Sequence, residues 1–368
     1  MKKTNKIVFI AGGGTGGHLY PAFSIGKELK KNGIEIIYIG SKNGIENKIF
    51  PQKNEIYYLL NITGIQRGKN AKSIIQNLSF PFKFLISYFL SIMLIIKHKP
   101  EAIIGTGGYC SGLPLIAGIT LNIPTYIQDQ NSIPGLVTKK LNNKINKIFL
   151  GYEEALIQLN NKNCIVSGNP LRQELVKTDI IIAKRKLKFN TKKKLLFILG
   201  GSQGANSINN HILKNINYYI NNDYQLLWQC GDNDYEYLNS QINYNGIKIK
   251  RFIEDMSISY SAADLIISRA GALAINEITY FGKPSIIIPF PQAAENHQLL
   301  NAKSLESKEA CIIVEQSNLF SGKLEEKIDY LFNKEKSCLN NITKNSKNIF
   351  KANATKIITN EIIKHISC

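Results

Sequence analysis

The sequence predicts an α/β protein of two domains, each with a parallel β-sheet covered by helices. Short apolar runs alternate with segments of helical length along the whole chain, which is typical of βαβ units. The 368 residues exceed the roughly 250–300 residues that one hydrophobic core usually holds. A strand that ends in Gly-Gly occurs once in each half, in 9–17 and again in 197–205.

Apolar runs rich in Ile, Val, Phe and Tyr mark the expected strands. In the first half these runs lie at 6–12, 35–40, 55–60, 101–107, 124–130 and 147–151. The second series lies at 194–201, 224–231, 247–252, 263–271, 284–290 and 310–315. The segments between them are long enough for crossover helices, so both series predict parallel sheets.

The expected domain boundaries follow from a change in composition between the two series. The stretch 168–193 contains a Gly-Asn-Pro turn and a run rich in Lys and Arg, so we interpret it as a linker. We expect an N-terminal domain over 1–167 and a C-terminal domain over 168–343. From about residue 344 the pattern predicts a terminal helix that packs back on the first domain.

Composition and charge exclude some classes of protein. The net charge of +19 favours phosphorylated or polyanionic partners, but Lys, Asn and Ile are frequent throughout, so charge alone identifies none. The aromatic and basic interleaving of RNA-binding modules is absent, so we expect no nucleic-acid partner. The six cysteines are scattered without a C-x-x-C pair, which indicates neither a zinc site nor a disulfide framework. The first strand starts close to Met1, so we expect no signal peptide and a cytoplasmic location.

Two glycine-rich loops occupy matching positions in the two series. Both "FIAGGGTGG" (9–17) and "FILGGSQGA" (197–205) follow a buried strand and lead into a helix. Such a loop lets the backbone approach an anion, which the helix dipole stabilises. Neither loop is a Walker A or a G-x-G-x-x-G sequence. We therefore expect two Rossmann-like halves that face a ligand cleft, with tight turns alone as the alternative.

His18 is the candidate catalytic base. It directly follows Gly17, so its side chain is expected at a helix start and in the cleft. An unperturbed imidazole titrates near neutrality and can accept a proton from an attacking hydroxyl. A purely structural histidine is the alternative.

The segment 263–302 predicts a sugar-nucleotide site. A strand ends at 268–271, and the helix that follows begins with small residues whose N–H groups can bind phosphate. Glu277 follows within two turns, where its carboxylate can accept two ribose hydroxyls. A polar turn at 295–298 comes after the next strand. The alternative is an ordinary βαβ unit with polar surface residues.

Six motifs, in order along nearly the whole chain, resemble the MurG family of peptidoglycan N-acetylglucosaminyltransferases. They are "GGGTGGHLYPA", "GTGGYCSGLP", "DQNSIPGL", "GNPLR", "GGSQGANSIN" and "SRAGALAINEI…GKPSIIIPFPQAAENHQ". The resemblance implies a GT-B fold, with UDP-N-acetylglucosamine on the C-terminal domain and the acceptor on the N-terminal one. It implies inverting transfer of N-acetylglucosamine to the 4-hydroxyl of the muramyl sugar of undecaprenyl-diphospho-MurNAc-pentapeptide, in cell-wall synthesis. Neither a metal nor a cofactor is expected.

The resemblance also implies roles for individual residues. His18 is the expected base and Asp129 its rival, and Tyr109 and Ser111 belong to the acceptor side. Ile253 is expected to contact uracil and Gln298 the sugar. The expected donor contacts are Thr15, Gly16, Gly17, Asn131, Arg172, Ser202, Ile253, Ala272, Leu273, Ala274, Ile275, Asn276, Glu277 and Gln298.

The chain departs from the family pattern at two places. Gln128-Asp129 stands where the family commonly has His-Glu, and Leu113 interrupts the usual Ser-Gly-Pro. Both departures concern the acceptor side. Two alternatives of the same architecture also remain: a diacylglycerol glycolipid hexosyltransferase and a UDP-N-acetylglucosamine 2-epimerase.

An apolar stretch predicts contact with a membrane surface. The uncharged run 84–96 would span roughly 20 Å as a helix, less than the ~30 Å hydrocarbon core. We therefore expect peripheral binding to an anionic leaflet on the cytoplasmic face of the cell inner membrane, with the later turns in the protein core. The expected patch consists of Ile74, Ile75, Leu78, Phe80, Phe82 and Phe84, flanked by Lys69, Lys72 and Lys83.

Overall fold

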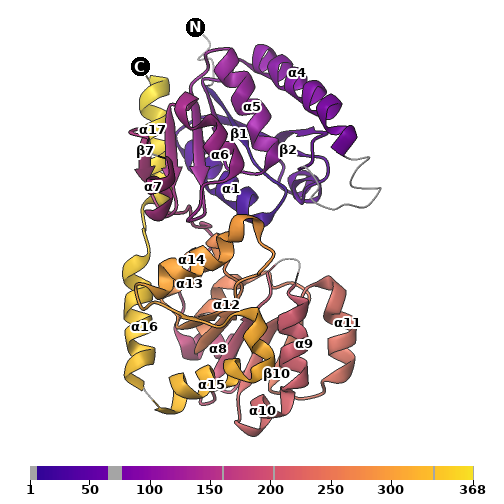
Figure 1. The fold of residues 1–368 in the computed structure, drawn as a ribbon, viewed down its shortest axis with the longest axis vertical. Helices are drawn as coiled ribbons and strands as arrows, with labels where there is room; N and C mark the ends of the chain where they lie inside the picture. Colours follow the sequence, from indigo (N-terminus) through magenta and orange to yellow (C-terminus); the bar gives the residue numbers. More distant parts are fainter. Residues whose placement is uncertain (1–5, 65–76, 160, 202–203, 335, 368) are drawn as a thin grey trace. The chain divides into compact units, whose positions relative to one another are not determined.

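The computed structural model describes residues 6–64, 77–159, 161–201, 204–334 and 336–367. The chain forms two compact units, which are Met1–Arg172 with Lys351–Cys368, and Gln173–Phe350. Each unit contains one parallel sheet with helices around it, so the predicted fold class is confirmed (Figure 1).

The first unit has a seven-stranded sheet of order β3-β2-β1-β4-β5-β6-β7. Its strands are β1 (Ile7–Ala11), β2 (Glu35–Ser41), β3 (Ile56–Leu60), β4 (Ala102–Gly105), β5 (Thr125–Asp129), β6 (Lys147–Leu150) and β7 (Cys164–Val166). The helices are α1 (Gly16–Lys31), α2 (Glu46–Ile49), α4 (Phe80–His98), α5 (Tyr109–Thr120), α6 (Leu136–Leu141), α7 (Glu154–Leu159) and α17 (Ala354–Ser367). The sequence pattern missed β7, a three-residue edge strand that is only half-buried.

Both faces of this sheet are buried, as its apolar strands require. Val8 and Ile10 of β1 pack with α1 and α17, whereas Phe9 and Ala11 pack with α4 and α5 on the other face. The strand period of two residues produces this alternation.

The second unit has a six-stranded sheet of order β10-β9-β8-β11-β12-β13. Its strands are β8 (Leu195–Leu199), β9 (Gln225–Gln229), β10 (Ile247–Lys250), β11 (Leu265–Ser268), β12 (Ser285–Ile287) and β13 (Ile312–Ile313). The α-helices are α8 (Ile180–Lys186), α9 (Asn206–Lys214), α10 (Ile216–Asn221), α11 (Asp232–Gln241), α12 (Met256–Ala262), α13 (Ala272–Phe281), α14 (His297–Glu306), α15 (Lys323–Asp329) and α16 (Lys336–Ile349).

The division between the units differs from the expected boundaries. It falls after Arg172 instead of 167, because Asn169 is bound within the first unit by hydrogen bonds with Gln128 and with the carbonyl of Gln130. The expected terminal helix from 344 is two helices. The first, α16, packs on α13 of the second unit, and α17 packs on α1 of the first unit (Figure 1).

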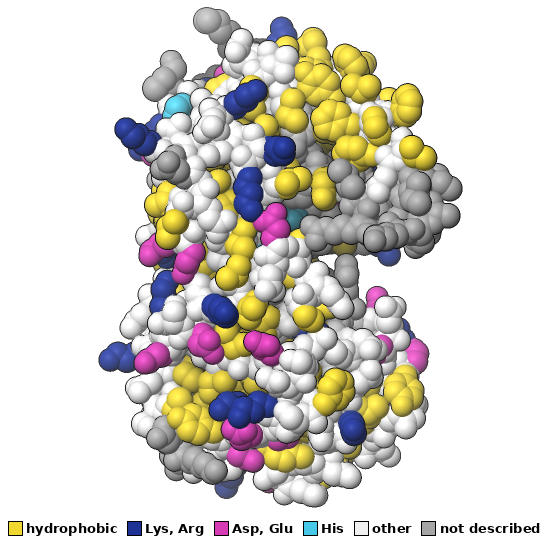
Figure 2. Space-filling view, in the orientation of Figure 1, with side chains coloured by type: hydrophobic (Ala, Val, Ile, Leu, Met, Phe, Trp, Pro, Cys, Tyr) yellow, Lys and Arg dark blue, Asp and Glu magenta, His cyan; other side chains and the backbone are white. Residues whose placement is uncertain are grey.

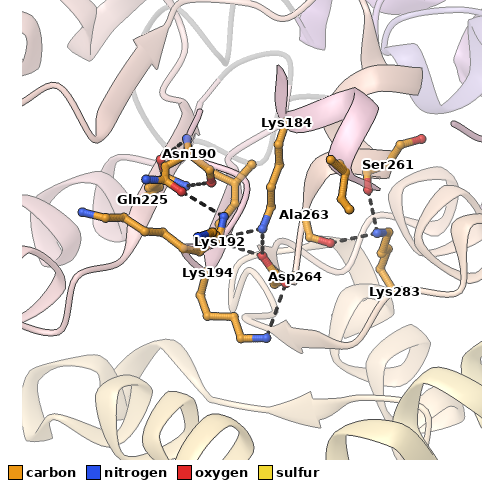
Figure 3. A network of polar contacts seen from close by, with 12 residues as sticks. Lys184, Asn190, Lys192, Lys194, Gln225, Ser261, Ala263, Asp264 and Lys283 are labelled. Carbon is orange, nitrogen blue, oxygen red and sulfur yellow. Dashed lines mark hydrogen bonds and ion pairs between the residues drawn. The ribbon is translucent and has the colours of Figure 1, made fainter. Parts of the chain in front are cut away.

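The expected linker contains a helix, α8, that buried polar contacts fix to the second sheet. Lys184 is buried and donates to Asp264 Oδ2 at 2.6 Å and to the carbonyl of Lys193 at 2.7 Å (Figure 3). Asp264 also accepts from the Leu195 N–H at 2.8 Å. Nearby, Lys283 donates to two carbonyls at the end of α12, and burial lowers its pKa to about 8.

Helix α4 differs from the prediction. Seven apolar side chains along it and just before it are 52–71% exposed, so only one face of the later turns, with Leu94 and Ile95, is core, and the expectation of core turns holds for that face alone. They are Leu78, Phe82, Leu85, Ile86, Phe89, Met93 and Ile96. Phe80 and Phe84 pack partly on the core. Figure 2 shows hydrophobic side chains gathered over this helix.

Helix α4 is also longer than the apolar run that predicted it. Among the described residues, it is the one helix long and apolar enough to cross a membrane by length and composition, with 22% of its apolar window buried. Of the expected patch, Lys69, Lys72, Ile74 and Ile75 lie outside the described residues.

We predict that Asp264→Ala destabilises the second unit by about 3–5 kcal/mol, because it leaves the buried ammonium of Lys184 without its carboxylate. Trp228 is the single tryptophan and is fully buried in this unit, so its fluorescence during urea unfolding reports the loss. Asp223→Asn is the control, because it removes the charge of the exposed Lys193–Asp223 pair, tolerates the positive φ of 59° at this position and should change the stability little. An equal loss of stability in the two variants would contradict the stabilising role of the buried Lys184–Asp264 pair.

Candidate active site

In the first unit, three neighbouring strands bring their carboxyl ends together. Strand β1 pairs with β4 and β4 with β5, and the strand order reverses at β1. Ligands of open parallel sheets bind outside the carboxyl ends at such a reversal. The loops after these strands hold the first glycine loop, Thr106–Gly108 and Gln130–Ser132.

His18 lies in the first turn of α1 and is fixed by the two neighbouring loops. Its Nδ1 is 3.1 Å from Gln130 Oε1, and Thr106 Oγ1 donates to its carbonyl at 2.9 Å. Gly107 and Gly108 have positive φ values of 102° and 79°. A Cβ on Gly107 would overlap the imidazole, so only glycine lets the loop after β4 approach this ring.

A buried carboxylate shapes the first glycine loop. Glu46 is fully buried and accepts from the N–H groups of Gly14 at 2.8 Å and Ser41 at 2.7 Å. The Gly14 N–H is therefore not available to a bound anion, so this loop has fewer N–H groups for an anion than the sequence led us to expect. Nothing in the sequence around Glu46 identified it, since its partners are backbone groups.

Two predicted site residues have structural bonds that sequence reasoning did not foresee. Asp129 is buried and accepts from Thr138 Oγ1 at 2.6 Å, from the Gly135 N–H at 2.8 Å and from the Asn131 N–H at 3.3 Å. These bonds fix the loop that leads into α6. Ser111 is also buried, and its hydroxyl donates to the Gly108 carbonyl at 2.8 Å, so it stabilises a turn and does not face solvent.

The other predicted residues of the first unit lie nearer the surface. Thr15 is exposed, and Gly16, Gly17 and Asn131 are half-buried. Tyr109 begins α5 and is exposed, with its ring against Gly64. The Arg172 guanidinium lies over the Tyr20 ring of α1, 5.0 Å from its centroid.

In the second unit, the start of α13 can bind an anion. The helix follows β11 directly, its N-cap residue Gly271 makes no side-chain capping bond, and its first turn has no acidic residue. A Cβ added to Gly271 would meet no atom within 4 Å, so the space beside this turn is open. The first-turn N–H groups, which include those of Ala272, Leu273 and Ala274, have no intrahelical partners and carry the positive end of the helix dipole.

Glu277 lies in the second turn of α13, beyond Ile275 and Asn276. It is buried, and Tyr260 Oη donates to its Oε2 at 2.9 Å. The Tyr260 ring is itself fixed by stacking on Phe281, with 5.1 Å between centroids. Sequence reasoning missed Tyr260, because α12 reads only as a buried helix.

Gln229 joins the second glycine loop to Ile253, a predicted donor contact. It donates to the Gly201 carbonyl at 2.8 Å and accepts from the Ile253 N–H at 2.9 Å. Gln298 lies in the first turn of α14 and accepts from the Phe290 N–H at 3.0 Å. Ser202 lies outside the described residues.

Arg269 ties together the loops around α13. It donates to the carbonyls of Ile288 and Pro289 at 3.2 Å, and to Ser207 Oγ and Gln316 Oε1 at 2.7 Å. Burial lowers its pKa to about 10, which still leaves it charged at neutral pH. Sequence reasoning placed Arg269 at a strand end but assigned it no role.

The two arrangements support different chemistry. The start of α13 with Glu277 suits a diphosphate joined to a diol, and the oriented imidazole of His18 suits proton transfer. In the part of the chain that the structure describes, no group of three or more His, Cys, Asp or Glu residues could hold a metal ion.

The chain is similar to known glycosyltransferases along nearly its whole length. Residues 8–150 match the glycosyltransferase family 28 N-terminal domain, and residues 195–359 match the family 28 C-terminal domain. A relative from Flavobacterium psychrophilum is 39% identical over 362 residues, which cover 96% of each chain. One from Bacillus subtilis is 35% identical over 328 residues, or 88% of this chain and 89% of the relative. Both are named UDP-N-acetylglucosamine–N-acetylmuramyl-(pentapeptide) pyrophosphoryl-undecaprenol N-acetylglucosamine transferase.

Solved structures extend the comparison. The crystal structure of Acinetobacter baumannii MurG has a TM-score of 0.76 at 26% identity and covers 98% of this chain and 99% of its own. A UDP-N-acetylglucosamine 2-epimerase has a TM-score of 0.63 at 12% identity, over 99% and 97% of the two chains, which shows the shared fold alone. Because relatives 35–39% identical match most or nearly all of its length, the chain belongs to the MurG family of N-acetylglucosaminyltransferases, with the two-domain GT-B fold.

Proposed function

We propose that this protein transfers N-acetylglucosamine from UDP-N-acetylglucosamine to the 4-hydroxyl of the muramyl sugar of undecaprenyl-diphospho-MurNAc-pentapeptide. The observation that carries the proposal is the 39% identity to a transferase of this name along nearly the full length of both chains. The product is the lipid-linked disaccharide that peptidoglycan synthesis consumes. The start of α13 and Glu277 add an independent reason, because they suit a nucleoside diphosphate.

The donor binds in the second unit. The first-turn N–H groups of α13 bind the diphosphate, and Glu277 accepts hydrogen bonds from the ribose hydroxyls while Tyr260 holds its carboxylate. Ile253 and Gln298 contact the uracil and the sugar. The helix dipole also stabilises the charge that develops on UDP as it leaves, so the reaction proceeds without a metal.

His18 is the base. It accepts the proton of the 4-hydroxyl while that oxygen bonds to the anomeric carbon and the bond from that carbon to the UDP oxygen breaks. One direct displacement inverts the anomeric centre. His18 is favoured over Asp129, because three donors already engage the Asp129 carboxylate within its own loop.

An assay of UDP release tests the function. In excess EDTA, UDP should appear only when a muramyl-pentapeptide diphospho-lipid is present with UDP-N-acetylglucosamine. Diacylglycerol that replaces this lipid as acceptor would identify the glycolipid transferase. Conversion of the donor alone would identify the epimerase. Activity that returns only with Mg²⁺ or Mn²⁺ would contradict the metal-free mechanism.

We predict that Glu277→Ala weakens UDP binding by about 1.5–3 kcal/mol, because the ribose loses a charged acceptor. Calorimetric titration of the variant with UDP measures the loss. Glu254→Ala is the matched control, since Glu254 is an exposed carboxylate next to Ile253, and it should bind UDP normally. Unchanged affinity in Glu277→Ala would remove this carboxylate from the donor site.

We predict that His18→Ala lowers the turnover rate by roughly 10²–10⁴-fold and leaves UDP affinity nearly unchanged, because it removes the base and not the donor site. Steady-state kinetics, UDP titration and thermal melting separate these effects. His365→Ala, which removes an exposed histidine of α17, should retain full turnover. A parallel fall of melting temperature, UDP affinity and turnover in His18→Ala would instead indicate a structural histidine.

The exposed face of α4 docks on the membrane that holds the acceptor. Buried Ser87, Ser91, Leu94 and Ile95 keep the opposite face on the sheet, so the helix lies on the surface and does not cross the bilayer. Lysines at 83, 97 and 99 sit at its ends and attract anionic lipid. We therefore propose a peripheral location on the cytoplasmic face of the inner membrane.

We predict that the triple variant Phe82→Ser, Phe89→Ser, Met93→Ser binds vesicles of anionic phospholipid at least about tenfold more weakly, since each side chain buries apolar surface in the interface. Co-sedimentation measures the binding. Ile157→Ser is the control, because Ile157 is 83% exposed on α7 and lies outside this face. Unchanged sedimentation of the triple variant would exclude α4 as the docking face.

A further inference from the structure

We infer that Gln130 is a positioning residue that fixes which nitrogen of His18 carries the proton. His18 Nδ1 and Gln130 Oε1 are 3.1 Å apart, and the direction of this bond decides the tautomer of the imidazole. If the amide oxygen faces the ring, Nδ1 must carry the hydrogen. The tautomer of His18 therefore depends on the orientation of the Gln130 amide.

Main-chain carbonyls determine this orientation, because a carbonyl oxygen can only accept. The Gln130 Nε2 lies 2.7 Å from the carbonyl of Thr106 and 3.3 Å from that of Gln128. A flipped amide would place its oxygen against two acceptors. The nitrogen must occupy this position, so Oε1 faces His18.

A second glutamine and an asparagine extend the same chain of bonds. Asn169 Nδ2 donates to the Gln130 carbonyl at 2.9 Å, which fixes the Asn169 amide. Its Oδ1 then accepts from Gln128 Nε2 at 3.0 Å, and Gln128 Oε1 accepts from Gln130 Nε2. All three side chains are buried, so solvent does not compete for these bonds. Each amide along this chain has one orientation that satisfies its partners.

The chain of amides sets His18 as the Nδ1–H tautomer, with the lone pair on Nε2. A glutamine achieves this without placing a charge beside the ring, unlike the carboxylate that orients histidine in many catalytic sites. Gln128 belongs to one of the two departures from the family pattern. Here its side chain connects Asn169 with Gln130 by hydrogen bonds. That Nε2 takes the acceptor's proton rests on the proposed function, whereas the tautomer itself does not.

Nitrogen-15 NMR of the full-length protein measures the tautomer without substrate. The protein has five histidines, and the His18→Ala spectrum identifies the His18 signals. At about pH 8.5, where an unperturbed imidazole is neutral, we expect a protonated Nδ1 and an unprotonated Nε2. The opposite tautomer would overturn the inference. The NMR measurement needs no turnover, so its outcome is independent of whether the proposed glycosyl transfer occurs.

Substitutions of Gln130 distinguish a role in orienting the His18 imidazole from a role in packing alone. Gln130→Met keeps the length of the side chain but removes the acceptor, so the Nδ1–H signal should weaken and kcat should fall about 10- to 100-fold with an unchanged KM for UDP-N-acetylglucosamine. Gln225→Met removes another buried glutamine, whose side-chain amide bonds to the backbone of Asn190, and should change neither the His18 tautomer nor kcat. A Gln130→Met protein with the wild-type tautomer and turnover would contradict the role of Gln130.

Discussion

The parallel pairing of β1 with β4, and of β8 with β11, is the constraint on which the rest of the structure depends. In each unit the strand order reverses at the first strand, so helices leave in opposite directions and the carboxyl ends of the strands are left open. Only small residues can turn the chain there without blocking this space. The glycine loops, the start of α13 and the imidazole of His18 all follow from this topology.

Much of the fold could be predicted from the sequence, because buried parallel strands are continuous apolar runs. The exceptions have physical causes. Strand β7 is too short and too exposed to show a pattern, and the packing of α16 and α17 on different units depends on tertiary contacts. The exposed face of α4 reads as core, because an exposed apolar face has the same composition as a buried one.

The candidate site was predictable only in part. His18 and Glu277 stand out because they are chemically active residues next to glycine or small-residue turns. Tyr260, Gln130 and Glu46 do not, since each acts through a hydrogen bond between segments distant in sequence. Asp129 shows the converse: its type suggested a base, and its bonds show a residue that holds a loop. A motif therefore mixes residues that are open to a ligand with residues that shape the backbone.

We propose that the start of α13 binds the diphosphate of the donor. Amide hydrogen exchange with and without saturating UDP tests it most directly, because first-turn amides lack intrahelical partners and exchange quickly in the free protein. We expect UDP to slow exchange at Ala272, Leu273 and Ala274 and at Ile253, and to leave the buried strand β1 unchanged. Unaltered exchange at the start of α13 under saturating UDP, or protection confined to the first glycine loop, would contradict it.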